Sequence, residues 1–108
     1  MDDDKVFDVY FELPDGYEVQ LMVLRDHAGG RPRRGGVVVF RSRVWVGHTA
    51  ESDPLLHRSQ EQSELNVAID ACYSMALQGA GQVIDSPDAL AVLQERVHAY
   101  FHGMEQVG

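Results

Sequence analysis

Three carboxylates occupy places in the sequence where a predicted strand or helix begins or ends. Asp26 closes a predicted strand, Glu64 opens a predicted helix, and Asp85 precedes a second predicted helix. Carboxylates at such ends can converge on one Mg²⁺ ion, which can bridge a phosphodiester and activate water. A structural alternative stays open, because acids near a helix start favour its dipole and its cap, and Asp26 can be an ordinary loop residue.

The order of these acids resembles that of the ribonuclease H family. The motifs that carry the resemblance are Asp26-His27-Ala28, Glu64-Leu65 and Asp85-Ser86, within a span from about Val19 to Tyr100. The resemblance implies a Mg²⁺-dependent nuclease, or a degenerate relative without catalysis, in which these three acids are the metal ligands. It also implies that the arginines of the glycine-rich segment after Asp26 approach the substrate phosphates. These are Arg31, Arg33 and Arg34.

A second pair of candidate ligands is His98 and His102, which are spaced i,i+4 on the second predicted helix with Glu95 and Glu105 nearby. Two imidazoles on one helix face can bind zinc, but zinc requires further ligands, and no Cys/His cluster supplies them. A solvated helix face is the simpler interpretation. The only cysteine, Cys72, falls on an apolar helix stripe, where we expect an inert core thiol.

Composition limits the partners. Nine basic and seventeen acidic side chains give 108 residues a formal charge of −8 and a pI near 4.9. Such a chain repels phosphate backbones and is steered towards basic surfaces. We therefore expect another protein as the partner, and nucleic acid only under the nuclease alternative.

Localisation is predicted from cysteine usage and hydropathy. A single cysteine cannot form an internal disulfide, and the sequence has neither the apolar run of a signal peptide nor a membrane-spanning stretch. We expect a cytoplasmic protein without membrane contact, and leave a homodimer open. Residues 1–5 resemble part of a protease tag and are expected to be disordered, and residues 26–36 are expected to form a flexible basic loop.

Alternating apolar residues predict strands at 6–13, 17–25 and 37–46, the last as one strand or two. Pro14-Asp15-Gly16 predicts a tight hairpin between the first two. Residues 47–58 are predicted to be irregular, and residues 82–84 to allow one short strand. The length corresponds to a single domain, residues 1–108.

Two amphipathic helices are predicted to follow. The first starts at Ser59 or Ser63 and ends at Gly79, and the second starts at Ser86-Pro87-Asp88. The first stripe consists of Leu65, Ala68, Ile69, Cys72, Met75 and Ala76, and the second of Leu90, Leu93, Val97, Phe101 and Met104. Together these elements predict an α+β two-layer sandwich, in which an antiparallel sheet of three to four strands is covered on one face by two C-terminal helices.

The sheet face turned away from the helices is then a candidate binding surface. Its expected members are Tyr10, Met22, Arg41, Arg43 and Trp45. Aromatic side chains and arginines are enriched in protein–protein hot spots. We therefore expect a non-enzymatic protein that docks on a macromolecule and inhibits or neutralises it, as inhibitors, immunity proteins and phage counter-defence proteins do. Cross-strand pairing that merely covers the sheet is the structural alternative.

Overall fold

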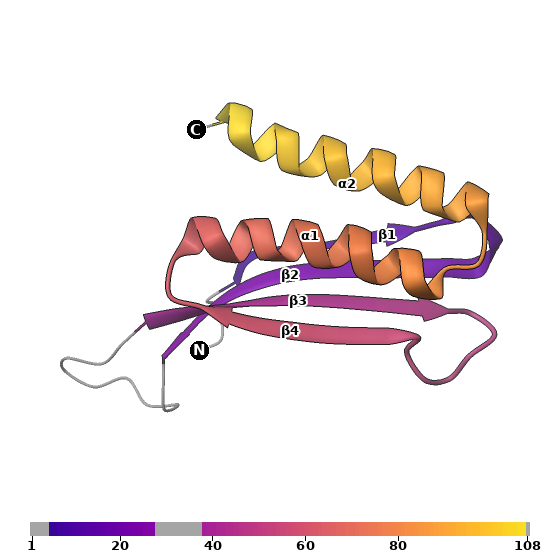
Figure 1. Ribbon diagram of the computed structural model, residues 1–108, viewed down its shortest axis with the longest axis horizontal. Helices are drawn as coiled ribbons and strands as arrows, with labels where there is room; N and C mark the ends of the chain where they lie inside the picture. The colour runs from indigo at the N-terminus through magenta and orange to yellow at the C-terminus, as the bar shows by residue number, and fades with distance from the viewer. Residues whose placement is uncertain (1–4, 28–37, 108) are drawn as a thin grey trace.

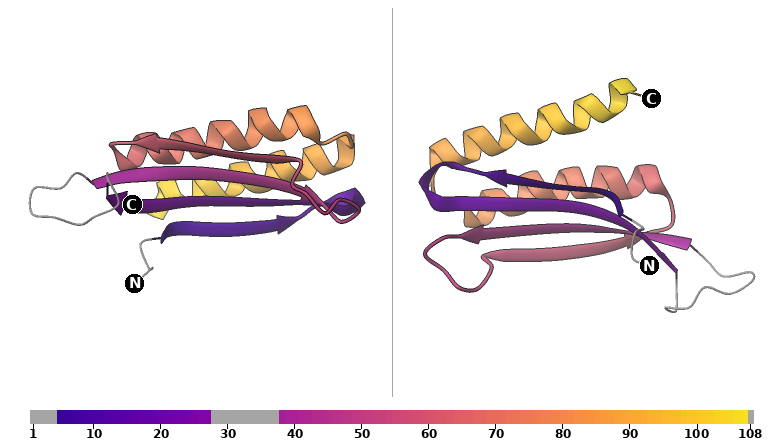
Figure 2. Two further views of the ribbon diagram at one scale, coloured as in Figure 1. Left: turned by 90° about the horizontal axis from the view of Figure 1, so that it is seen from below. Right: turned by 180° about the vertical axis from the view of Figure 1, so that it is seen from behind.

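A four-stranded antiparallel sheet carries two helices on one of its faces (Figures 1 and 2). The computed structural model describes residues 5–27 and 38–107. The elements in chain order are β1 (Lys5–Glu12), the 3₁₀ turn η1 (Pro14–Gly16), β2 (Tyr17–His27), β3 (Val38–His48), β4 (Leu56–Gln62), α1 (Leu65–Val83) and α2 (Pro87–Val107). The strands lie in the order β1-β2-β3-β4. The predicted α+β two-layer architecture is confirmed.

The core lies between the sheet and the helices. Alternate residues of the central strands face it, with Leu21 opposite Val44 and Val23 opposite Ser42. All four are fully buried, and the Ser42 hydroxyl donates a hydrogen bond to the carbonyl oxygen of Ala68 in α1. Because strand side chains alternate between faces, the residues between them point to the opposite side of the sheet.

The hairpin turn has the predicted Pro-Asp-Gly chemistry. Asp15 and Gly16 have positive φ angles of 62° and 85°. Aspartate tolerates this left-handed region and glycine enters it without steric cost. The predicted tight hairpin between β1 and β2 is confirmed.

The start of α2 is fixed by Ser86, as its sequence predicts. The Ser86 Oγ accepts a hydrogen bond from the backbone N–H of Ala89 at 3.1 Å and donates one to the Asp15 carboxylate. The serine thus caps the helix and also joins it to the β1–β2 turn.

The strand β4 was not predicted. Residues 47–58 were expected to be irregular and Ser59 or Ser63 to cap the first helix, yet Leu56–Gln62 forms β4 and the N-cap of α1 is Glu64. The strand lies at the border of the sheet, and most of its side chains are exposed. An edge strand of this kind lacks the apolar alternation that identifies a half-buried strand in a sequence.

Two expectations about α1 were wrong. Gly79 does not end the helix, which continues to Val83, so residues 82–84 do not form the short strand that the sequence allowed. A Cβ on Gly79 would lie 2.7 Å from the Cδ2 of Leu56, which means that the glycine permits close packing of α1 on β4. Leu65, expected on the buried stripe, is 37% exposed.

Several boundaries are clearer in the structure than in the sequence. The expectations were wrong for Lys5, which belongs to β1 and is not disordered, and for Asp26 and His27, which belong to β2 and not to a loop; β3 is one strand. The expectations of disorder at residues 1–4 and of a basic loop at Arg31, Arg33 and Arg34 lie outside the described residues. Within the described part of the chain, no helix is long and apolar enough to cross a membrane.

Candidate functional site

One face of the sheet is left uncovered by the two helices. We call it the open face and define it by the alternate strand residues that point away from α1 and α2; Figure 2 (left) shows the sheet from this side, with the helices behind it. The structure places all five candidate contact residues on the open face, namely Tyr10, Met22, Arg41, Arg43 and Trp45. They come from β1, β2 and β3, so the meander brings them together.

Trp45 lies flat along its own strand. A Cβ built on Gly47, two residues further along β3, would lie 2.7 Å from Cζ2 and 3.0 Å from Cζ3 of the indole, and closer still to Cη2. The indole therefore lies directly over the Gly47 backbone, which it buries, while the ring itself stays half-buried. This packing holds a large aromatic surface in one orientation on the open face.

The two arginines of β3 differ in their partners. Arg41 is held by two carboxylates, with its Nε 3.1 Å from Asp26 and its Nη2 3.2 Å from Glu61. Arg43, which lies opposite Met22 and between Arg41 and Trp45 on the same strand face, has no salt bridge to any of the described residues. The five N–H donors of its guanidinium are therefore not used in a salt bridge with the described residues.

Carboxylates gather on the β1–β2 side of the open face. Glu12 and Glu18 lie directly opposite each other on adjacent strands, a like-charge pairing that destabilises a sheet. The Tyr10 hydroxyl donates a 2.6 Å hydrogen bond to Glu18, and this bond raises the pKa of Tyr10 to about 12. A cationic group of a partner placed between the two glutamates would remove their repulsion.

Asp8 is a further carboxylate of the open face that forms an ion pair within the chain, as Asp26 and Glu61 do with Arg41. It accepts a 2.8 Å hydrogen bond from Gln20 and lies 3.1 Å from the Lys5 ammonium. The hydrogen bond from Gln20, followed by the effects of Lys5, lowers the pKa of Asp8 despite some desolvation.

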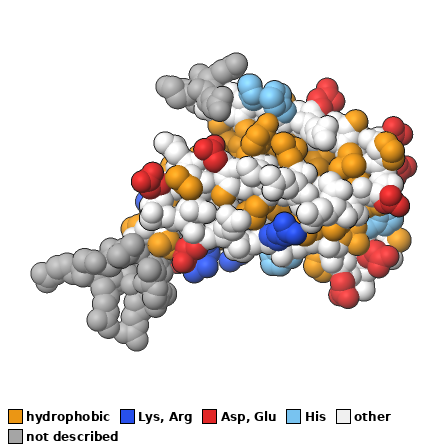
Figure 3. Space-filling model, in the orientation of Figure 1, with side chains coloured by type: hydrophobic (Ala, Val, Ile, Leu, Met, Phe, Trp, Pro, Cys, Tyr) orange, Lys and Arg blue, Asp and Glu red, His pale blue; other side chains and the backbone are white. Residues whose placement is uncertain are grey.

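Further acidic side chains lie at one end of the molecule. This is the end where η1, the β3–β4 connection and the α1–α2 connection meet, visible as the red atoms on the right of Figure 3. The exposed acids there are Asp15, Glu51, Asp53, Asp85 and Asp88. Among the described residues, acidic side chains thus gather at one end of the long axis and along the β1–β2 side of the open face, while Glu61, Glu64, Asp70 and Glu95 lie elsewhere.

The three carboxylates proposed as metal ligands do not converge. Asp26 lies in β2 and pairs with Arg41, whereas Glu64 and Asp85 lie just beyond opposite ends of α1. Nineteen helical residues separate the last two by about 28 Å, so they cannot share an ion. Among the described residues, no group of three His, Cys, Asp or Glu side chains is placed to hold a metal.

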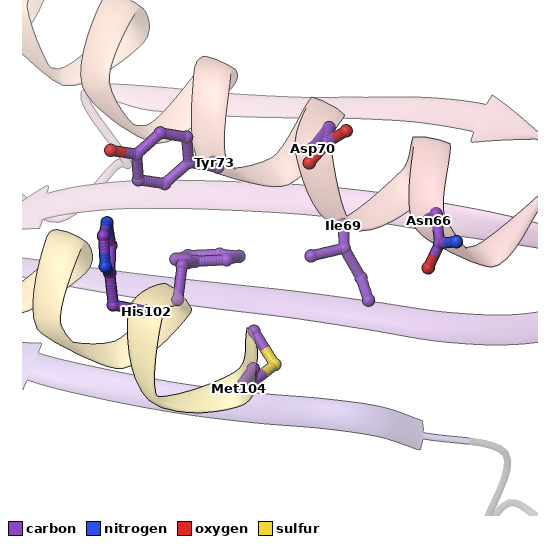
Figure 4. A pocket seen from close by; sticks show the side chains of 7 residues that line it. Asn66, Ile69, Asp70, Tyr73, His102 and Met104 are labelled. Carbon is purple, nitrogen blue, oxygen red and sulfur yellow. The ribbon is translucent and has the colours of Figure 1, made fainter. Parts of the chain in front are cut away.

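The two histidines of α2 lie beside each other, and His102 also lines a hollow between the helices. His98 and His102 have ring centroids 4.0 Å apart, and His98 Nδ1 lies 3.2 Å from the Tyr73 hydroxyl of α1. The hollow, about 420 Å³ in volume, is lined mainly by Ile69, Tyr73, Phe101, His102 and Met104 (Figure 4). Both imidazoles are exposed, which agrees with a solvated helix face.

Cys72 is a core residue without nucleophilic character. Its side chain is fully buried, and burial raises the pKa of the thiol to about 12. A protonated thiol is a poor nucleophile and a poor metal ligand. Burial of Cys72 therefore accounts for the inert thiol that the sequence predicts.

Two features of the open face were missed in the sequence. The contact between Trp45 and Gly47 has a signal in the Trp-x-Gly spacing, because residues i and i+2 of a strand share a face. The opposition of Glu12 and Glu18 follows from the hairpin register once the turn is placed at 14–16.

Comparisons with known proteins do not add to this description. No family model matches the chain, and neither a curated protein nor a solved structure matches it. The function is therefore argued from the side chains of the open face.

Proposed function

We propose that the chain is a non-enzymatic binding protein that docks the open face of its sheet on another protein and thereby inhibits or neutralises it. The observation that carries this proposal is the uncovered group of Trp45, Arg43, Met22 and Tyr10, of which Tyr10 is 49% exposed. An ordered indole beside an arginine that has no salt bridge is more typical of a binding surface than of a sheet face that contacts only solvent.

The energetics of protein recognition support this surface. Binding energy is concentrated in a few tryptophan, tyrosine and arginine side chains that lose water on contact, each worth about 2 kcal/mol or more. The indole of Trp45 is already ordered by its packing on Gly47, so little conformational entropy is lost when a partner covers it.

The charge distribution supports a partner with a basic surface. The formal charge is −8, and the repelling pair of Glu12 and Glu18 borders the aromatic group. Acidic surfaces increase the rate of encounter with basic ones and disfavour other partners. Arg43, the cation in this acidic surrounding, would then select the orientation of docking by requiring one acceptor group on the partner.

An active Mg²⁺-dependent nuclease has less support. It requires Asp26, Glu64 and Asp85 at one ion, and two of them lie at opposite ends of α1.

The experiment compares two charge reversals on the purified chain as bait. Arg43→Glu changes the centre of the open face, and Arg96→Glu makes the same change at an exposed position of α2, a helix on the other side of the sheet. Proteins retained from extracts of the native host are quantified, and the affinity of the strongest binder is then measured directly.

The proposal expects Arg43→Glu to weaken that binder by about 30-fold or more and Arg96→Glu to leave it unchanged. Both variants should unfold cooperatively near the wild-type temperature. Equal binding by all three chains, or a binder without a basic surface, would contradict the proposal.

A further inference from the structure

The outer edge of β4 is regular, and no strand of the described residues pairs with it. β4 pairs with β3 over seven residues without a register shift, and it is the last strand of the sheet. The opposite edge, β1, is interrupted by an irregularity between Lys5 and Phe7. Bulges and lysines hinder edge pairing, whereas a regular edge presents unpaired N–H and C=O groups that can continue the sheet.

We propose that the occupant of this edge is a second copy of the chain, with the two β4 strands antiparallel about a twofold axis at Ser59. A sheet must keep its helix-side residues on one face, so β4 residues can lie opposite only residues that face the same way. The twofold axis must therefore pass beside a residue and not between two residues of β4. The residues near the centre of the strand that satisfy this are Arg58, Ser59 and Gln60.

The charges of β4 select among these three registers. An axis at Ser59 pairs all seven residues and places His57 of each copy opposite Glu61 of the other copy. An axis at Arg58 would place the two Arg58 side chains opposite each other, which is unfavourable. An axis at Gln60 pairs only five residues of β4 and leaves His57 without a carboxylate opposite it, whereas the imidazole in the Ser59 register can hydrogen-bond to Glu61.

The space beside β4 permits this pairing. The helix-side residues of β4 include Arg58 and Gln60, and both are exposed although α1 lies over β3 and β4. The helix therefore leaves the outer border of β4 free; Figure 1 shows β4 along the border of the sheet with α1 above it. In the dimer, Arg58 of each copy would lie opposite Gln60 of the other.

The dimer would join two open faces into one. Each row across the interface would run from Arg43 through Ser59 to Ser59 and Arg43 of the second copy. Three strand spacings separate the two arginines by about 14 Å. The inference does not rest on the proposed function, because the pairing uses only β4, but it would present two copies of the Trp45 and Arg43 group to one partner.

The first test measures the mass of the protein in solution and compares two substitutions of Gln60 that are expected to change the dimer Kd in opposite directions. Light scattering after gel filtration should give twice the chain mass of 12.1 kDa at micromolar concentration. Gln60→Arg places an arginine opposite Arg58 of the second copy and should raise the dimer Kd about tenfold, whereas Gln60→Glu should lower it. A chain that stays monomeric at millimolar concentration, or variants that shift Kd in the same direction, would overturn the proposal.

The second test identifies the register. Ser59→Cys places two thiols beside each other at the axis, so a short bis-maleimide should join two chains. His57→Cys is the matched control, because its thiols would be offset by about 13 Å along the strands. The native Cys72 is buried and does not interfere. Cross-linking through His57→Cys in place of Ser59→Cys would show a different interface and overturn the proposal.

Discussion

The contact between Trp45 and Gly47 can be tested by a substitution whose sign depends on the indole. Gly47→Ala adds a methyl group 2.7 Å from Cζ2 of the ring, whereas carbon atoms pack at about 3.5–4.0 Å. The ring must therefore move by about 1 Å, and such overpacking costs about 1–3 kcal/mol. Gly47 does not have a positive φ angle, so alanine itself is tolerated and gains about 0.5–1 kcal/mol over glycine. The net expectation is a loss of about 1 kcal/mol.

A double-mutant cycle separates these two effects. In a Trp45→Ala background the methyl group meets no ring, so Gly47→Ala should now stabilise the fold by about 0.5–1 kcal/mol. Unfolding free energies of the four proteins are measured in urea by circular dichroism. The chain has a single tryptophan, so its fluorescence spectrum reports the expected displacement of the indole in the Gly47→Ala variant.

The contact would be refuted if the change in unfolding free energy caused by Gly47→Ala did not depend on the presence of Trp45. If Gly47→Ala changes stability equally in both backgrounds, the indole does not lie on Gly47. The description of an immobilised aromatic group on the open face would then be wrong.

Three further predictions concern single side chains. Ser86→Ala, which removes the cap of α2 and its bond to Asp15, should cost about 1–2 kcal/mol of unfolding free energy in urea denaturation. Cys72, whose pKa is raised to about 12, should not react with a thiol reagent at pH 8 until the chain unfolds, and fast reaction of the native protein would contradict its burial. Because the folded-state pKa of Asp8 lies below its ordinary value of 3.8, the stabilisation it provides is present above that pH and is lost as the pH falls through the folded value. Gln20→Ala should make this acid-induced loss shallower in pH-dependent thermal melts, and an unchanged slope would exclude the hydrogen bond as its cause.

The fold could be predicted wherever local chemistry agrees with burial. Apolar alternation identified the strands that face the helices, and the Ser86 cap and the Pro-Asp-Gly turn specify their own backbone geometry. β4 was not predicted because a strand at the edge of the sheet, with most of its side chains exposed, does not need alternating apolar residues. The end of α1 was wrongly predicted at Gly79 because a sequence does not distinguish a glycine that allows close packing from a glycine that ends a helix.

The parts of the candidate site that depend on local sequence could also be predicted, and the parts that depend on tertiary contacts could not. Strand parity was enough to place Trp45 and Arg43 on one face, because parity is a local property. The convergence of Asp26, Glu64 and Asp85 depends on tertiary arrangement, and the length of α1 keeps two of the acids apart. The pairing of Arg41 with Asp26 and Glu61 likewise depends on strand neighbours that are distant in sequence.

The position of α2 has a consequence for synthesis on the ribosome. The apolar side of the hairpin, with Phe7 and Phe11, is covered by the last helix, and Phe7 meets the ring of Phe101 with centroids 5.7 Å apart. A nascent chain therefore exposes the apolar side of this hairpin until α2, which is 21 residues long, has left the exit tunnel. Premature termination before α2 should yield aggregates that require chaperones.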